Sequence, residues 1–465
     1  MRDNILEILQ VLREYARERT ASRDAAVIFS CRHEESSLMR FANSAVSLNS
    51  SEQLIRLNIT AVEGRRRAGS SLITSLSALE EMKQAVADVV AMVGHAQPLN
   101  YTPSVPVLDE THINEQYWDE TLAAVTNAEK LAYFNKAVQG LETPDLTLSG
   151  IFSSGMNILA ITNTLSDHAL FFKTSDAQVS AVLAHQKLKW EVIAEQSAQQ
   201  FNDLDPAPLH RELGFLKQLY ESEAPCRMDL GCYDIVFGPA AIADLVRVMN
   251  WIVFDGGLMK RGYSFLDEDQ IGKRIFSQKF SVVDDPRRRE TFPLNRDMTG
   301  LARKPFALID QGRFCGYTWS QDDADEFDRT PTGHTVAHKS LCVAGGDHPV
   351  DSLEELAKTP RKKKILYIPF LHYMNVVNPS KGIITASSRF GALLLKKDGG
   401  VALPFNVRLT RSLADIFGDK LEWLTRDTIA YNTSGSYGAR NPTAIVVPRF
   451  MKVNDLEISH SNASY

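Results

Sequence analysis

Cysteine is scarce in this chain, and its positions form no recognisable pairing pattern. The 465 residues include five cysteines, which is an odd number, and no two of them have the C-x-x-C spacing. This distribution fits a reducing compartment better than a disulfide scaffold. A chain of this length can also bury a sizeable core without disulfides or metals.

Long apolar runs and an excess of positive charge are lacking as well. No apolar run approaches the roughly 18 residues of a membrane span, and the N-terminal segment 1–19 alternates apolar residues with charges in the manner of an amphipathic helix rather than a signal peptide. The 51 basic and 57 acidic residues give a net charge of −6, so no global basic field attracts nucleic acid. We therefore expect a cytoplasmic protein that binds neither membranes nor nucleic acid.

Two common catalytic loops are also missing. The glycine pairs Gly256-Gly257 and Gly399-Gly400 are isolated, and neither belongs to a phosphate-binding Gly-x-x-x-x-Gly-Lys-Ser/Thr loop. The Gly-x-Ser-x-Gly elbow of serine hydrolases does not occur. The sequence thus carries neither signature.

The apolar residues that are present follow helix and strand periodicities. The first 95 residues predict an amphipathic helix with one apolar face, a short strand, two strands in a hairpin and a second amphipathic helix. The residues behind these predictions are Ile5, Leu6, Ile8, Leu9, Leu12 and Tyr15 for the first helix, Ala25–Ser30 for a short strand, Leu54–Val62 and Ser70–Thr74 for the hairpin, and Leu79–Val93 for the second helix. An N-terminal α+β domain over residues 1–97 is predicted.

Proline and apolar patterns divide the rest of the chain. Three prolines make His95–Pro106 a linker. Beyond it, the patterns predict helices at Asn114–Val138, Leu209–Glu221, 239–251 and 411–417, and strands at Thr147–Thr174, in Gln178–Val192 and from Tyr233 onward. The predicted fold class is α+β, with an N-terminal α/β segment, a middle α+β domain over 107–222 and a C-terminal, mostly antiparallel β domain with a few helices over 228–465. For Gly262–Pro286 the pattern predicts a strand, a turn, a helix-like turn and a strand.

Two histidines have a spacing that suits a metal site on a helix. His334 and His338 are four residues apart, but Thr335 stands where a zinc hydrolase motif carries a glutamate to activate water. The preceding residues 329–333 resemble a turn. We interpret both histidines as hydrogen-bonding or packing residues, and metal ligation remains the alternative.

Three other polar residues have competing interpretations. Asp284 and Asp285 could bind a cation together, but neighbouring strand residues point to opposite faces, so a turn before Pro286 is the better interpretation. Cys315 has no obvious partnered base, which favours a buried structural thiol on a strand over a nucleophile.

Several local motifs occur in an order that resembles the TldD/PmbA family, once described as modulators of DNA gyrase. The motifs are Leu38–Ser44, Ala61–Gly69, Tyr263–Leu266 with Ile271–Arg274 and Val282–Pro286, Asp310–Phe314 followed by Thr332–His334, and Ile383–Gly391. In the TldD branch of this family, a helix before the Ser-Phe-Leu motif carries His-Glu-x-x-x-His, and a cysteine near the C-terminus completes a zinc site. Here the corresponding helix reads Ala-Ala-Ile-Ala-Asp-Leu-Val at Ala240–Val246, and Gly438–Ala444 contains no cysteine.

The resemblance therefore implies the PmbA branch, also called TldE. It implies a subunit that is not catalytic alone, holds no cofactor itself, and pairs with a TldD-like metallopeptidase that carries the zinc and acts on unfolded or precursor peptides. We expect a homodimer when the chain is isolated and a partner surface in the strand-rich residues 365–410, with His334, Arg389 and His338 as candidate cleft residues. The alternatives are a metallopeptidase in its own right that uses His334 and His338, and a nucleic-acid or gyrase-associated binding protein.

Overall fold

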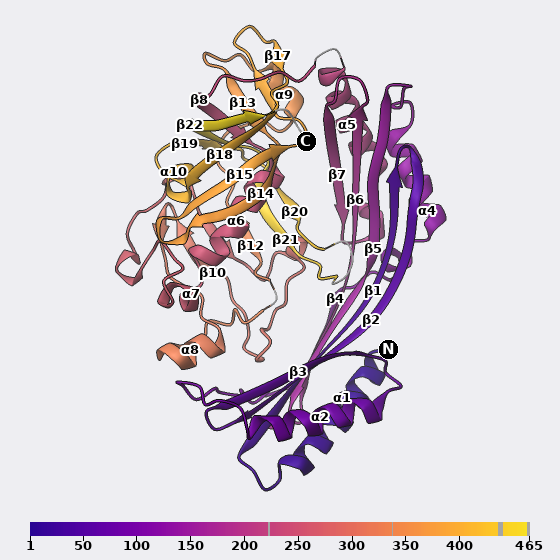
Figure 1. The fold of residues 1–465 in the computed structure, drawn as a ribbon, viewed down its shortest axis with the longest axis vertical. Coiled ribbons are helices and arrows are strands. Elements are labelled where there is room, and N and C mark those ends of the chain that lie inside the picture. The colour runs from indigo at the N-terminus through magenta and orange to yellow at the C-terminus, as the bar shows by residue number, and fades with distance from the viewer. Residues whose placement is uncertain (222–223, 337, 436–439, 463–465) are drawn as a thin grey trace.

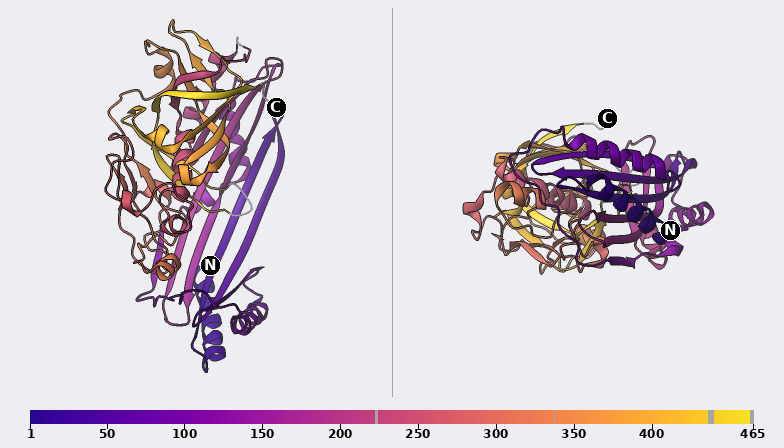
Figure 2. Two further views of the ribbon diagram at one scale, coloured as in Figure 1. Left: turned by 60° about the vertical axis from the view of Figure 1, so that its left-hand side comes forward. Right: turned by 90° about the horizontal axis from the view of Figure 1, so that it is seen from below.

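The chain forms two lobes that lie side by side (Figures 1 and 2). The computed structural model describes residues 1–221, 224–336, 338–435 and 440–462. An elongated N-terminal lobe contains the long strands, and a C-terminal lobe contains many shorter ones, which confirms the α+β fold class. In the described part, no helix combines the length and apolar character needed to cross a membrane.

One seven-stranded sheet forms the N-terminal lobe. Its order is β3-β2-β1-β5-β6-β4, and β7 also pairs with β6. The strands are β1 (Ala25–Ala42), β2 (Ala45–Glu63), β3 (Arg66–Thr74), β4 (His112–Tyr117), β5 (Leu146–Asn163), β6 (Ala169–His185) and β7 (Glu191–Ala198). Because β1 pairs with β5, the sheet joins the predicted segments 1–97 and 107–222. Their division into separate domains stays a prediction, and its boundary residue 222 lies outside the described residues.

Helices cover this sheet at both ends. They are α1 (Arg2–Thr20), α2 (Leu79–Val93), α3 (Glu120–Ala123), α4 (Asn127–Val138), the 3-10 helix η1 (Phe201–Asp203) and α5 (Pro206–Tyr220). The first two were predicted, and α1 buries Ile5, Leu9 and Leu12 against the sheet. The predicted alternation of β2 is confirmed too, since Ile55, Leu57 and the residues at 59 and 61 are buried.

Two predictions for this lobe are wrong, one in the length of a strand and one in the type of element. The strand predicted at Ala25–Ser30 continues to Ala42, because β2 and β5 flank it along nearly its whole length and supply partners for its polar residues. The helix predicted at Asn114–Val138 is a strand, β4, followed by two helices. The longer one begins where Thr126 and Glu129 form a capping box.

Two sheets make up the C-terminal lobe. The six-stranded sheet has the order β11-β10-β9-β12-β21-β20, and the nine-stranded sheet has the order β14-β15-β18-β22-β8-β13-β16-β17, with β19 on β22. Their strands are β8 (Gly231–Phe237), β9 (Val282–Asp284), β10 (Phe306–Asp310), β11 (Arg313–Phe314), β12 (Leu341–Val343), β13 (Ile365–Ile368), β14 (Phe370–Asn378), β15 (Ile383–Arg389), β16 (Leu393–Leu395), β17 (Val401–Ala402), β18 (Asn406–Ser412), β19 (Leu421–Leu424), β20 (Thr428–Asn432), β21 (Ala444–Pro448) and β22 (Met451–Asn462).

The helices of this lobe are mostly short. They are α6 (Pro239–Ile252), α7 (Gly256–Lys260), η2 (Glu268–Gln270), η3 (Arg289–Thr291), α8 (Gln321–Phe327), α9 (Leu353–Lys358), η4 (Pro379–Lys381) and α10 (Leu413–Phe417). The predicted helices near 239–251 and 411–417 are thus confirmed. In Gly262–Pro286 only the second predicted strand forms, as β9. The first is replaced by turns, in which Asp267 caps η2 with its side chain.

Strand β5 contains a glycine that no larger residue can replace without a shift of the backbone. A Cβ atom on Gly155 would lie 2.0 Å from the carbonyl oxygen of Glu35 on β1. We expect Gly155→Ala to lower the free energy of unfolding by about 1–3 kcal/mol, measured by urea denaturation. The neighbouring Ser154→Ala is the control, because it removes a buried hydroxyl that has no hydrogen-bond partner within the described ranges and should change stability by less than about 0.5 kcal/mol. Equal effects of the two variants would refute this account.

Candidate functional site

Helix α6 lies where the two lobes meet, and its start is fixed by a close contact. Gly238 precedes the helix, and Pro239 occupies its first turn. A Cβ atom at Gly238 would lie 2.9 Å from the hydroxyl oxygen of Tyr367 and 3.1 Å from the Cα atom of Pro369, so a larger residue here would require its neighbours to shift. The side of α6 that carries Ala240, Asp244 and Arg247 lines cavities between the lobes.

Three such cavities adjoin one another, and together we call them the interlobe groove. A central cavity of about 430 Å³ is lined by Glu195, Glu212 and Pro239, among others. It shares Glu195 and Tyr431 with a second cavity of about 580 Å³, which lies between β7 and β20. At its other end it shares Phe390 and Gly391 with a third cavity of about 510 Å³. The groove therefore runs between the edge of the N-terminal sheet and the C-terminal lobe.

Charged side chains of both signs line the middle of the groove, namely Glu195, Glu212, Glu354, Arg211 and Arg449. The surrounding protein raises the pKa of Glu195 to about 7, although the side chain still reaches solvent, and a hydrogen bond from the Tyr431 hydroxyl works in the opposite direction. Desolvation by neighbouring protein atoms likewise raises the pKa of Glu212 to about 7, although this side chain is also exposed, and burial raises the pKa of Asp244. Glu195 and Glu212 are therefore only partly ionised at neutral pH.

The groove side of α6 holds few metal-binding side chains. Asp244 lies on it and is paired with Arg247 at 2.9 Å. Across the described part of the chain, no three His, Cys, Asp or Glu residues are grouped in a way that could hold a metal ion. The C-terminal segment Gly438–Ala444, predicted to lack a third ligand, begins outside the described residues, since 436–439 are not among them.

Of the three predicted cleft residues, the structure places only Arg389 beside the groove. Arg389 lines the third cavity, and its guanidinium lies 3.7 Å from the carboxylate of Glu191. His334 lies inside the C-terminal lobe, where its Nδ1 contacts the Asp284 carboxylate. His338 lies nearby, and its Nε2 donates to the carbonyl oxygen of Phe292 at 3.0 Å. The functional roles of the three residues stay predictions.

The residues around His334 form a buried ion cluster. Asp284 accepts hydrogen bonds from Arg303 at 2.8 and 2.9 Å and from the backbone N–H of Ser340 at 2.7 Å. Burial favours the neutral acid, but His334 and Arg303 outweigh this effect and lower the pKa of Asp284 to about 2. Burial lowers the pKa of His338 to about 4, so this imidazole is neutral at physiological pH.

The remaining polar candidates have ordinary structural positions. Asp285 faces away from Asp284 and pairs with Arg287 at 2.9 Å, as expected for adjacent residues in front of a proline. Cys315 was predicted to be buried on a strand, which is wrong: it follows β11 and is exposed. The two-residue strand β11 ends before Cys315, and the thiol therefore extends into a surface turn.

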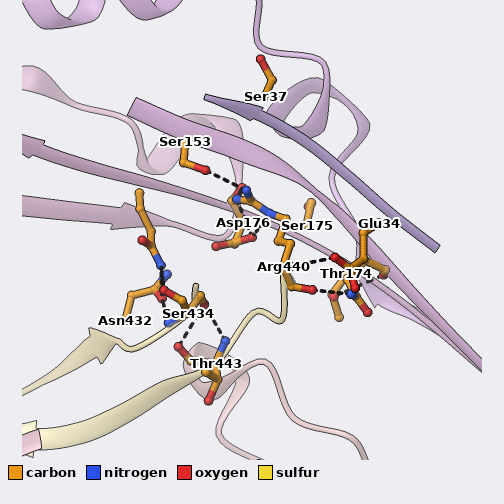
Figure 3. Close-up of polar contacts among 12 residues, drawn as sticks. Glu34, Ser37, Ser153, Thr174, Ser175, Asp176, Asn432, Ser434, Arg440 and Thr443 are labelled. Atoms are coloured by element: carbon orange, nitrogen blue, oxygen red, sulfur yellow. Dashed lines mark hydrogen bonds and ion pairs between the residues drawn. The ribbon is translucent and has the colours of Figure 1, made fainter. Parts of the chain in front are cut away.

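A second buried ion pair holds the C-terminal segment against the N-terminal sheet (Figure 3). Arg440 is 1% exposed, and its guanidinium donates to Asp176 on β6 at 2.7 Å and to Ser153 on β5 at 2.8 Å. Its backbone N–H donates to Glu34 on β1 at 2.9 Å, and its carbonyl oxygen accepts from Asn157 at 2.5 Å. One residue of the segment that follows β20 thus contacts three strands of the other lobe.

The sequence interpretation missed Glu195, Glu212, Tyr431 and Arg440. Each is an ordinary residue in a strand, helix or loop. Only the two-residue period of a strand places Glu195 and Val192, three residues apart, on opposite sides of β7. No local signal indicates which lobe Arg440 contacts.

Comparison with known proteins relates the C-terminal lobe to a known family. Residues 230–460 match the family description "PmbA/TldA metallopeptidase C-terminal domain". The C-terminal lobe is therefore related to a metallopeptidase domain. The chain belongs to the TldD/PmbA family. No curated protein matches its sequence.

Three solved structures share the fold across almost the whole chain. TldE from Thermococcus kodakarensis has 15% identity and a TM-score of 0.78, over 97% of this chain and 100% of that one. A proposed modulator of a DNA gyrase from Thermotoga maritima has 13% identity and a TM-score of 0.77, over 97% and 100%. A proposed modulator of DNA gyrase from Bacteroides thetaiotaomicron has 15% identity and a TM-score of 0.75, over 96% and 98%. At these identities the likeness establishes the fold alone.

Proposed function

We propose that this chain is a TldE-like subunit that is not catalytic alone and assembles with a TldD-type zinc metallopeptidase acting on unfolded or precursor peptides. The observation that carries the proposal is the groove side of α6. The resemblance implies that the TldD branch holds its zinc and its water-activating glutamate on this helix. In this chain the same side presents Ala240, Asp244 and Arg247. The zinc would belong to the partner.

The proposed role of the subunit is to close the cleft of its partner, so that only an extended peptide can enter. Such a role needs a large contact surface with an apolar centre. Strand β14 is the candidate, because it forms the edge of the nine-stranded sheet. Tyr373 and Val377 on it are 64% and 57% exposed. In the absence of the partner, we expect this surface to form a homodimer.

An assay of the two subunits, alone and mixed, tests the proposal. We expect hydrolysis of an unstructured fluorogenic peptide only in the mixture, and loss of that hydrolysis with a chelator. Hydrolysis by this chain alone, removed by a chelator and by His334→Ala, would instead establish it as a metallopeptidase in its own right.

The partner surface can be tested by size-exclusion chromatography with light scattering. We expect Tyr373→Asp to weaken assembly with the TldD-type protein by at least about 10-fold, as for a central aromatic contact. Tyr263→Asp is the matched control, because Tyr263 is 55% exposed but lies outside residues 365–410. A chain that remains monomeric and binds no TldD-type protein would refute the proposal.

A further inference from the structure

The interlobe groove contains strand edges that can pair with an extended chain. In the described part, β20 pairs with β21 and with no other strand, and it ends the six-stranded sheet. Its residues Ile429–Asn432 line the cavity of about 580 Å³, opposite Gln196 of β7. A free strand edge presents backbone N–H and C=O groups in a row, which is the usual way in which a protein binds a peptide in an extended conformation.

Three glutamates (Glu195, Glu212, Glu354) and two arginines (Arg211, Arg449) line the central cavity, so its charge is negative but largely compensated. Arg449 acts on Glu212, where it lowers the pKa. Glu195 lines both the central cavity and the β20 cavity. The negative charges of Glu212 and Asp244 are close enough to raise the pKa of Glu195 further. Asp244 already has Arg247 as its partner. Within the described ranges, Glu195 has no Lys, Arg or His partner at ion-pair distance, so a positively charged ligand group would be attracted to it.

The walls beside Glu195 suit a long side chain rather than a bare ion. Phe215, Leu216 and Phe370 line the central cavity. Lysine and arginine bury their aliphatic stems against apolar surface and keep the charged group at a polar atom. A metal ion would need several ligands, and the described carboxylates do not form such a group.

We infer that the interlobe groove of this chain binds an extended peptide along β20 and takes one lysine or arginine side chain of that peptide at Glu195. This inference rests on the proposed function, since it names the class of peptide that the complex would accept. It adds a substrate-selecting site on the subunit that lacks the zinc.

The test uses two matched decapeptides with acetylated N-termini and amidated C-termini. One carries a single lysine among alanine, serine and valine residues, and the other carries norleucine, which has no ammonium group, at the same position. Fluorescence anisotropy with the full chain at pH 8 should show about 10-fold tighter binding of the lysine peptide, the effect of one charge-assisted contact. In an extended peptide, alternate backbone N–H groups point toward the neighbouring strand. Methylation of one alternating set of nitrogens in the lysine peptide should therefore weaken binding, and methylation of the other set should not.

The variant Glu195→Gln keeps the shape of the groove and removes the charge. We expect it to lower the affinity for the lysine peptide about 10-fold and to leave the norleucine peptide unaffected. Glu52→Gln is the control, because Glu52 is exposed on β2, away from the groove. Since the pKa of Glu195 is about 7, the unmodified chain should bind the lysine peptide several-fold more tightly at pH 8 than at pH 6. Glu195→Gln should lose most of this dependence, and the remainder should come from Glu212, whose pKa is also about 7.

Each outcome decides one part of the inference. Equal binding of both peptides would overturn the site for a basic side chain, and no binding of either peptide would overturn peptide binding in this groove. Either failure is distinguishable from failure of the proposed function, because heterodimer formation and chelator-sensitive hydrolysis are measured separately on the same preparation.

Discussion

Replacing Arg440 by methionine is expected to lower the free energy of unfolding by about 3–5 kcal/mol, the cost of removing one partner of a buried ion pair. The carboxylate of Asp176 is 1% exposed and would lose the guanidinium that bonds to it. Burial already raises the pKa of Asp176, and Arg440 opposes that shift. Without Arg440, this carboxyl would take up a proton in the folded protein.

Urea denaturation at several pH values measures this effect. Because the folded variant would bind a proton that the unfolded chain releases, the deficit of Arg440→Met should shrink as the pH falls from 8 to 5. The double variant Asp176→Leu/Arg440→Met should recover much of the lost stability, since neither buried charge remains. Arg66→Met is the control, because Arg66 is exposed and its side chain, among the described residues, bonds only to the carbonyl oxygen of Gly94.

A deficit below about 1 kcal/mol, or one independent of pH, would show that Arg440 is not a principal contact between the lobes. The same preparations can be digested with a protease at low concentration. We expect Arg440→Met to be cleaved faster than the control near the segment that follows β20, because this segment would lose its attachment to β1, β5 and β6.

Local periodicity was sufficient to predict the elements whose burial follows a simple pattern. Helices α1 and α2 each bury one stripe of apolar residues, and β2 alternates strictly along its C-terminal half. Helix α6 was predicted from an apolar sequence after Pro239. These features depend on neighbours within a few residues.

Features that depend on long-range pairing were not predictable in the same way. Polar residues such as Glu34 and Ser36 obscured the second half of β1, which is stabilised by pairing with β2 and β5. The β4 segment has few apolar residues and becomes a strand through parallel pairing with β6. The contact of Arg440 with Asp176 joins residues 264 positions apart, and no local pattern records such a distance.

The candidate site shows the same division between local and long-range information. The sequence indicated that His334 and His338 are not zinc ligands of the usual motif, but it could not show that Asp284 would be the partner of His334. Glu195 was missed because its environment is built by β20, α6 and β7, which are far apart in the sequence. Chemistry at such a groove can be inferred only once the fold has brought these elements together.

Asp284→Asn is expected to lower the free energy of unfolding by about 3–5 kcal/mol, because it leaves the guanidinium of Arg303 buried without a counter-charge. Both side chains are 0% exposed. The adjacent Asp285→Asn is the matched control. Its partner Arg287 is 73% exposed, so this pair should contribute no more than about 1 kcal/mol. Urea denaturation at pH 7 compares the two variants, and equal losses would show that Asp284 and Arg303 do not stabilise the lobe as described.

The acid sensitivity of the protein should identify the same residue. The pKa of Asp284 is about 2 in the folded chain, against about 3.9 for an unfolded aspartate. A carboxyl whose pKa is lowered by folding stabilises the protein fully above its unfolded pKa and loses this contribution as the pH falls through its folded pKa. We therefore expect the unmodified chain to lose about 2–3 kcal/mol from this group between pH 5 and pH 2, and Asp284→Asn to lose correspondingly less over that range. If Asp284→Asn and Asp285→Asn showed the same decline in acid, the ion cluster of Asp284, Arg303 and His334 would not be the source of the acid sensitivity.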